Sequence, residues 1–157
     1  MGLKECMLSR IKVEPFIYIK SIPEFQKPML RNIFYNSIQA SNITEETALD
    51  ENIIQLIASN ISLEFGLLDW QSKRLAKTEF SKFRTLGFID LLNSEGIYNC
   101  RVSTGSDGFD DCIRLIDGKT FETKTLLDNV YKNYNLKHPM YPAVPLHPNC
   151  NHYIIRP

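Results

Sequence analysis

Three soft or borderline metal ligands, His147, Cys150 and His152, lie within six residues near the end of the 157-residue chain. This density is high for a chain with only three histidines and four cysteines. Zinc prefers thiolate and imidazole ligands, and a closed structural site needs four of them in a tetrahedron. Cys112 is the best fourth candidate, because it precedes a turn from which its thiolate could face the C-terminal segment across a sheet. The alternative is that the histidines only form hydrogen bonds in a proline-rich surface loop.

A catalytic role fits this cluster less well. Zinc deaminases need a glutamate two residues after a histidine ligand and a later cysteine pair, and neither His138 nor Cys150 has such a neighbour. A nucleophilic pair of Cys150 with His147 or His152 is disfavoured, because residues so close in sequence rarely reach attack geometry. The spacing therefore favours a structural metal site.

Two charged clusters are further candidate sites. The acidic loop of Asp107, Asp110 and Asp111 lacks the spacing of a calcium loop, so we expect a solvated turn. A second cluster makes one side of a long predicted helix basic, and it consists of Lys73, Arg74, Lys77, Lys82 and Arg84. We expect a solvated face there; the alternative is a contact for a phosphate backbone or an acidic partner.

Composition indicates an ordinary globular protein, with 43% hydrophobic and 23% charged residues. The formal net charge is zero, which argues against a general electrostatic grip on nucleic acid. No apolar run approaches the ~20 residues of a membrane span, and residues 1–10 lack the plan of a signal peptide. We therefore expect no membrane contact, a cytoplasmic compartment, and free cysteines, with Cys6 and Cys100 as buried small apolar residues.

The elements that must position the cluster follow from hydrophobic periodicity and end signals. Residues 1–22 are expected to form an N-terminal arm, with an extended or edge-strand segment at 12–19. A helix is predicted to open near Pro23, and another to begin after an N-cap at Asp50 and end at Gly66. A long amphipathic helix follows, from an N-cap at Asp69 to a stop at Gly96. Its predicted core stripe is Trp70, Leu75, Ala76, Phe80, Phe83, Leu86 and Ile89.

After Gly96 the pattern changes to short strands and turns. A strand is predicted at 97–103, a turn at Asp117-Gly118, a short helix around 126–131 and a last strand at 153–155. Helices followed by strands predict an α+β fold, in which N-terminal helices precede a small antiparallel sheet and a zinc-stabilised C-terminal tail. The expected division is the arm at 1–22 and a single domain at 23–157, with a helical part (23–96) and a β-rich part (97–157).

Three segments in order resemble the phage Mu protein F-like head morphogenesis family, the minor head proteins of tailed phages. The first, Ala76-Lys77-Thr78-Glu79, is similar to that family's Ala-Arg-Thr-Glu helix, and Gly87 and Gly96 follow it. The second runs from Thr104 through Cys112 to an Asp-Gly-Lys-Thr-Phe turn at 117–121. The third, at 145–152, resembles the family's ending Pro-x-His-Pro-Asn-Cys-Arg-Cys or Pro-x-His-Pro-Asn-Cys-Arg-His. The resemblance covers about Trp70 to Pro157.

The chain departs from the family pattern at two kinds of position. Lys77 and Asn151 stand where arginine is usual, and Cys112 is alone where the family often has a cysteine pair. The resemblance thus leaves Cys112, His147, Cys150 and His152 as a minimal four-ligand set for structural zinc.

The resemblance implies a structural virion component without enzymatic activity. Its expected partners are portal and capsid proteins, with packaged DNA involved only indirectly and with no small-molecule substrate. It would act in head assembly or DNA packaging, in the host cytoplasm during assembly and then in the virion. Two alternatives stay open: a small metal-dependent nuclease or toxin domain, and a host zinc-stabilised binding module.

Overall fold

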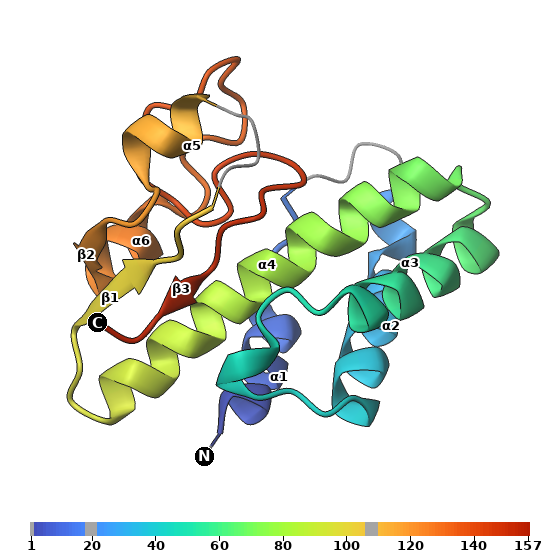
Figure 1. Ribbon diagram of the computed structural model, residues 1–157. Helices are drawn as coiled ribbons and strands as arrows, with labels where there is room; N and C mark the ends of the chain where they lie inside the picture. Colours follow the sequence, from blue (N-terminus) through green and yellow to red (C-terminus); the bar gives the residue numbers. More distant parts are fainter. Residues whose placement is uncertain (1, 18–21, 106–109) are drawn as a thin grey trace.

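In the computed structural model, which describes residues 2–17, 22–105 and 110–157, a long helix separates a helical layer from a small sheet (Figure 1). The helical layer consists of α1 (Leu3–Val13), α2 (Lys27–Ala40) and α3 (Glu51–Phe65), with short 3₁₀ turns η1 (Glu24–Gln26) and η2 (Glu45–Thr47). The long helix is α4 (Asp69–Ser94), against which α1 and α3 pack most extensively. The predicted α+β class is confirmed.

The second part of the chain lies on the other side of α4 (Figure 1). It contains β1 (Asn99–Val102), α5 (Asp110–Leu115), β2 (Thr120–Glu122), α6 (Thr123–Asn129) and β3 (Ile154–Ile155). The sheet is antiparallel in the order β2-β1-β3, with Arg101 opposite Thr120 on one side and Ile155 on the other. Pairing with β1 therefore holds β3, and the loop before it, beside α4.

Local end signals place the helices as predicted in most cases. The Asp50 carboxylate accepts hydrogen bonds from the amides of Asn52 and Ile53, at 2.8 and 3.2 Å, as an N-cap does. Gly66 ends α3 at a φ of 67°, a left-handed conformation that glycine adopts without strain. Asp69 is not the N-cap of α4 but its first helical residue, and Leu68 occupies the cap position.

One core runs through both parts, from Leu3 to Ile154. Phe16, Phe34 and Phe83 meet in it with ring centroids 5.5 to 5.8 Å apart, and thereby join the segment after α1 to α2 and α4. At Gly87, α1 and α4 approach so closely that an added Cβ would lie 2.8 Å from Met7. Glycine is required there by space, because only a residue without a side chain fits.

The N-terminal segment and the surface of α4 differ from the sequence-based expectation. The predicted extended segment at 12–19 is wrong at Lys12 and Val13, which form the end of α1; 18–19 lie outside the described residues. Trp70, predicted to be in the core, is 60% exposed. Lys82 and Arg84, predicted on a solvated face, are buried, because α4 is covered on both sides.

No helix among the described residues is long and apolar enough to cross a membrane.

Candidate metal centre

Cys112, Cys150 and His152 form a buried group whose ligand atoms all lie within 4.8 Å of one another and could hold a metal ion. The two Sγ atoms are 4.0 Å apart, and the Cys150 Sγ lies 3.9 Å from the His152 Nδ1. Around a tetrahedral zinc ion, ordinary bond lengths separate two sulfurs by about 3.8 Å and a sulfur from a nitrogen by about 3.5 Å. The observed spacings are therefore close to those of a zinc site.

Three separate elements bring these ligands together. Cys112 lies on α5, not before a turn as the sequence suggested, and its carbonyl accepts the amides of Ile116 and Asp117 at 3.0 and 2.9 Å. Cys150 follows a tight turn in which its amide donates to the His147 carbonyl at 3.2 Å. His152 immediately precedes the segment that pairs with the end of β1, where the Ser103 amide donates to the Tyr153 carbonyl at 2.8 Å.

The long helix supports the turn that carries Cys150. The Asn149 amide donates to the Thr78 Oγ1 at 3.1 Å, and Asn149 has a φ of 62°, which asparagine tolerates better than most residues. Lys77, one residue earlier on α4, donates to the Asn151 side chain. The turn is thus held against α4 on both sides of Cys150.

The hydrogen bonds of the two histidines direct one ring nitrogen of each toward the sulfurs. The His152 Nε2 lies 2.7 Å from the Asp117 Oδ1, and the His147 Nδ1 lies 2.8 Å from the Pro148 carbonyl. Carboxylate and carbonyl oxygens only accept, so these nitrogens carry the proton. The opposite nitrogens, His152 Nδ1 and His147 Nε2, then present lone pairs. Metal-ligating histidines have this arrangement, with an oxygen fixing the tautomer and the ring orientation.

His147, the fourth predicted ligand, contacts the group without belonging to it. Its Nε2 lies 3.0 Å from the Cys112 Sγ, but the tight group comprises only Cys112, Cys150 and His152. The structure therefore brings three of the four predicted residues together and places the fourth against one of them.

The pKa of Cys150 is shifted in the opposite direction to those of Cys6 and Cys100. The pKa of Cys150 is well below its ordinary value, chiefly because of its hydrogen bond with Cys112 and also that with His152, although burial acts in the opposite direction. Burial instead raises the pKa of Cys6, and that of Cys100 to about 11. All four cysteines are free and buried. Cys6 and Cys100 are thus confirmed as core residues, whereas the surroundings of Cys150 favour its thiolate form.

The other predicted clusters form no comparable site. Asp107 lies outside the described residues, and Asp110 and Asp111 are in the first turn of α5, where Asp111 pairs with Arg114 at 2.9 Å. Among the described residues, the Cys112, Cys150 and His152 group is the one cluster of His, Cys, Asp or Glu with this geometry.

Sequence reasoning missed Asp117 as a partner of the cluster. The Asp-Gly pair at 117–118 was interpreted as a turn, and Gly118 does have a left-handed φ of 65°. The Asp117 Oδ1 also accepts a hydrogen bond from the Gly105 amide at 3.0 Å, so one carboxylate oxygen joins the segment after β1 to His152. A usable signal was present, because metal-ligating histidines commonly have a carboxylate partner.

Comparison of the chain with protein families, with curated proteins and with solved structures finds no match.

Proposed function

We propose that the group binds one zinc ion with Cys112, Cys150, His152 and His147 as ligands. Two thiolates and two imidazoles are a donor set that zinc favours. The support for His147 is its Nε2, which lies 3.0 Å from the Cys112 Sγ while its Nδ1 is bonded to a carbonyl. With His147 as the fourth ligand the coordination would be tetrahedral and closed. The ion would then join α5, the turn at 147–150 and the segment before β3.

The proposed role of the zinc is structural. A hydrolytic zinc site keeps an open coordination position and a general base beside it. Here Cys112, Cys150 and His152 are each at most 2% exposed, which leaves little room for a substrate. The burial therefore weighs against the nuclease or toxin alternative.

At the level of the whole chain, the proposed function is that of a structural minor head protein of a tailed phage or prophage. The observation that carries it is the convergence of the three segments that resemble the head morphogenesis family. Thr78 of the first accepts the Asn149 amide of the third, and Asp117 of the second bonds His152 of the third. These contacts join all three segments around the loop at 147–152, as expected if the three segments form one structural unit of that family.

The proposed partners are the portal and capsid proteins, with DNA contacted only indirectly. The protein would be made in the host cytoplasm and incorporated into the virion during head assembly or DNA packaging. A host zinc-stabilised binding module would use the same group, so the partner, and not the metal, distinguishes these two functions.

Zinc stoichiometry tests the first part of the proposal. Purified protein is expected to contain one zinc ion per chain by elemental analysis, and chelation should lower its melting temperature, because binding to the folded state alone stabilises it. Cys150→Ser and His152→Ala should each lose the metal. Cys100→Ser, which changes an equally buried thiol outside the group, is the matched control. Wild-type protein without zinc would contradict the proposal.

The second part is tested in two ways: by analysing purified phage heads for the protein, and by nuclease assays on the same zinc-loaded preparation. We expect the protein to be present in purified heads and to co-purify with the portal protein of the same particle. Absence from the particles would contradict the head-protein function while leaving the zinc result standing. Cleavage of DNA or RNA that needs the metal and is abolished by His147→Ala would contradict the structural role.

A further inference from the structure

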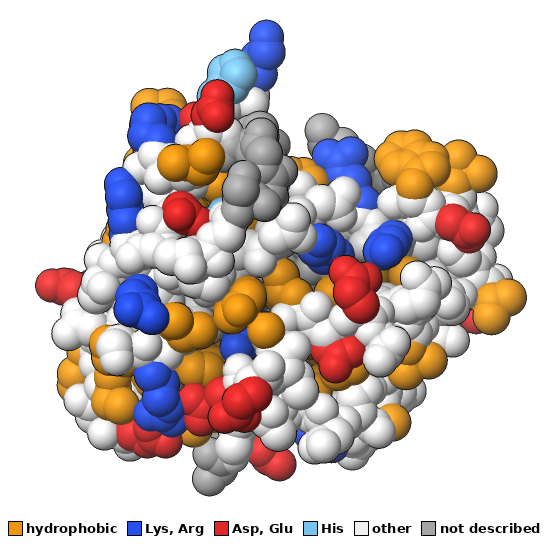
Figure 2. Space-filling view, in the orientation of Figure 1, with side chains coloured by type: hydrophobic (Ala, Val, Ile, Leu, Met, Phe, Trp, Pro, Cys, Tyr) orange, Lys and Arg blue, Asp and Glu red, His pale blue; other side chains and the backbone are white. Residues whose placement is uncertain are grey.

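One face of the first two turns of α4 carries an exposed tryptophan among three cations. Trp70, Lys73, Arg74 and Lys77 are spaced i, i+3, i+4 and i+7, so they form one stripe along the helix. We call these four residues the Trp70 stripe. Figure 2 shows basic side chains gathered over this half of α4, beside apolar ones at the end of the molecule. The stripe ends where the Lys77 side chain donates to Asn151, because the loop at 147–151 covers the helix from there on.

Two further large apolar side chains are exposed within seven residues of Trp70 along the chain. Leu68, in the connection before α4, is 60% exposed, and Leu63 near the end of α3 is 84% exposed. Large apolar side chains that are exposed together, and bordered by polar ones, mark interaction surfaces. Trp and Arg are also the residues most enriched among those that dominate binding energy at protein interfaces.

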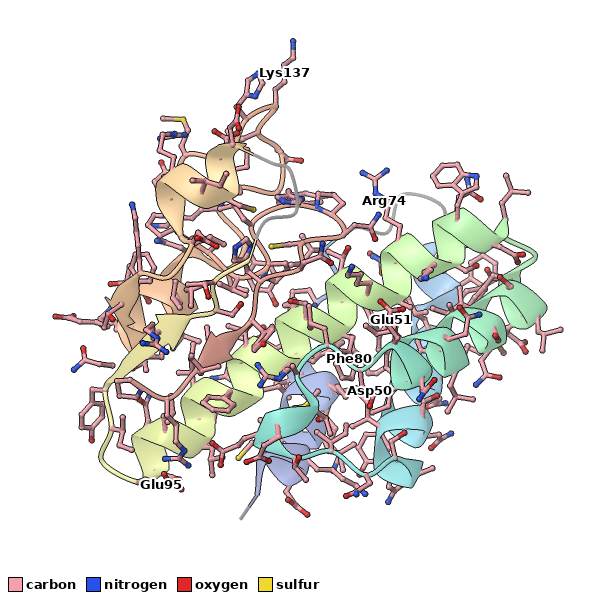
Figure 3. All side chains as sticks on the ribbon, viewed as in Figure 1. Asp50, Glu51, Arg74, Phe80, Glu95 and Lys137 are labelled. Atoms are coloured by element: carbon pink, nitrogen blue, oxygen red, sulfur yellow. The ribbon has the colours of Figure 1, made fainter. Side chains whose placement is uncertain are left out.

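Two of the three cations of the stripe, Lys73 and Arg74, are available to a partner, whereas Lys77 donates to Asn151. Within the described residues Arg74 has no ion pair, and Figure 3 shows its side chain projecting away from α4. The Lys73 Nζ lies 3.5 Å from the Glu51 Oε2, and both side chains are more than half exposed. Exposed ion pairs contribute little free energy, so a partner's carboxylate could replace Glu51 at little cost. The stripe itself contains no acidic residue.

We propose that the Trp70 stripe, with Leu68, docks an acidic amphipathic helix of a partner protein. The stripe spans eight residues of α4, from Trp70 to Lys77, a rise of about 10 Å, which matches two turns of a facing helix. Carboxylates on that helix would face Lys73 and Arg74, and one large apolar side chain would pack on Trp70. This inference depends neither on the metal nor on the head-protein function.

The surroundings favour a protein over a nucleic acid. Glu51 and Asp69 border the stripe and are exposed, so a continuous phosphate backbone would meet negative charge at its edge. The chain as a whole has no net charge to attract a polyanion. Discrete carboxylates on a helix can face the cations and avoid these borders.

The experiment uses the fact that Trp70 is the only tryptophan of the chain, so its fluorescence reports on the stripe directly. The probes are a synthetic amphipathic helix with Leu on one face and Glu on the other, the same peptide with Lys for Glu, and a single-stranded DNA oligonucleotide. We expect the acidic peptide to shift the emission to the blue, to protect Trp70 from acrylamide, and to bind more weakly as salt rises. The basic peptide should cause no shift.

Substitutions locate the binding. The double variant Lys73→Glu/Arg74→Glu should weaken binding of the acidic peptide at least tenfold, and Trp70→Ala should abolish it when followed by calorimetry. Lys137→Glu is the matched control, because Lys137 is an exposed lysine on the loop far from α4 (Figure 3). Circular dichroism should show all variants folded, since the changed side chains are exposed. No saturable shift with the acidic peptide, an unchanged affinity in the double variant, or tighter binding of DNA than of the peptide would each overturn the proposal.

Discussion

The hydrogen bond between Asp117 and His152 gives the sharpest test of the metal centre. Asp117→Asn keeps an oxygen that can accept from the His152 Nε2 and from the Gly105 amide, but it removes the charge. A hydrogen bond to a charged group contributes about 1 kcal/mol more than a neutral one. That difference corresponds to a zinc affinity lower by a factor of about five to ten. Asp117→Ala also removes the acceptor, and we expect a loss nearer a hundredfold.

Competition with a chromophoric zinc chelator measures these affinities, and thermal unfolding of the metal-free proteins measures what the substitutions cost without zinc. Asp128→Asn is the matched control, because Asp128 forms an exposed ion pair with Lys124 on α6, outside the group. Its zinc affinity should equal that of the wild type. If Asp117→Asn and Asp117→Ala both bind zinc as the wild type does, then Asp117 does not position His152 and the argument from the tautomers fails.

Three further predictions concern stability and are checked by urea unfolding. Gly87→Ala should destabilise the protein by about 1–3 kcal/mol, because its Cβ would lie 2.8 Å from Met7; an unchanged midpoint would refute the close approach. Lys82→Met should lower the free energy of unfolding by about 3–5 kcal/mol, because it removes the ion pair of the buried Glu79 carboxylate, whose Oε2 lies 2.6 Å from the Lys82 Nζ. Adding Glu79→Leu should recover much of this loss. A double variant no more stable than the single one would contradict this reasoning. Burial raises the pKa of Cys100 from 9.0 to about 11, so the unfolded chain releases this proton first. The contribution of Cys100 to the free energy of unfolding is therefore complete below pH 9 and falls by about 2–3 kcal/mol as the pH rises to 11. If a Cys100→Ala variant loses stability with the same slope between pH 9 and 11, Cys100 is not the cause.

The sequence was a good guide wherever the signals are local. Asp50 at the start of α3, Gly66 at its end and Gly96 after α4 act through backbone groups a few residues away, so their types alone indicate the boundaries. The helix α1 was missed because the alternation at 12–19 and Pro15 favoured an extended segment. That helix is stabilised by packing on α4 at Gly87, a contact between residues 80 positions apart that no local pattern reveals.

Burial of charge was the least predictable feature. Lys82 and Arg84 are buried while Lys73 and Arg74 on the same helix are exposed, and residue type alone does not distinguish the two pairs. The grouping of Cys112, Cys150 and His152 was predictable because Cys and His are rare in the chain and specific in their chemistry. The carboxylate of Asp117 was not recognised, because an Asp-Gly pair has a sufficient local explanation as a turn.

The two buried cations of α4 also determine where the sequence of this protein is free to change. Lys82 donates to the Pro15 carbonyl, and Arg84 donates to the carbonyls of Ile154 and Glu45, each at 3.0 Å. Every residue type has a backbone carbonyl, so the three segments that these cations hold could exchange many side chains and keep the same bonds. The helix has no such freedom at its two donors. Mutational tolerance should therefore be low at 82 and 84 and higher at the exposed acceptor position 15, whereas Ile154 is also constrained by its place in the core. Evolutionary drift should leave α4 as the most recognisable part of the chain.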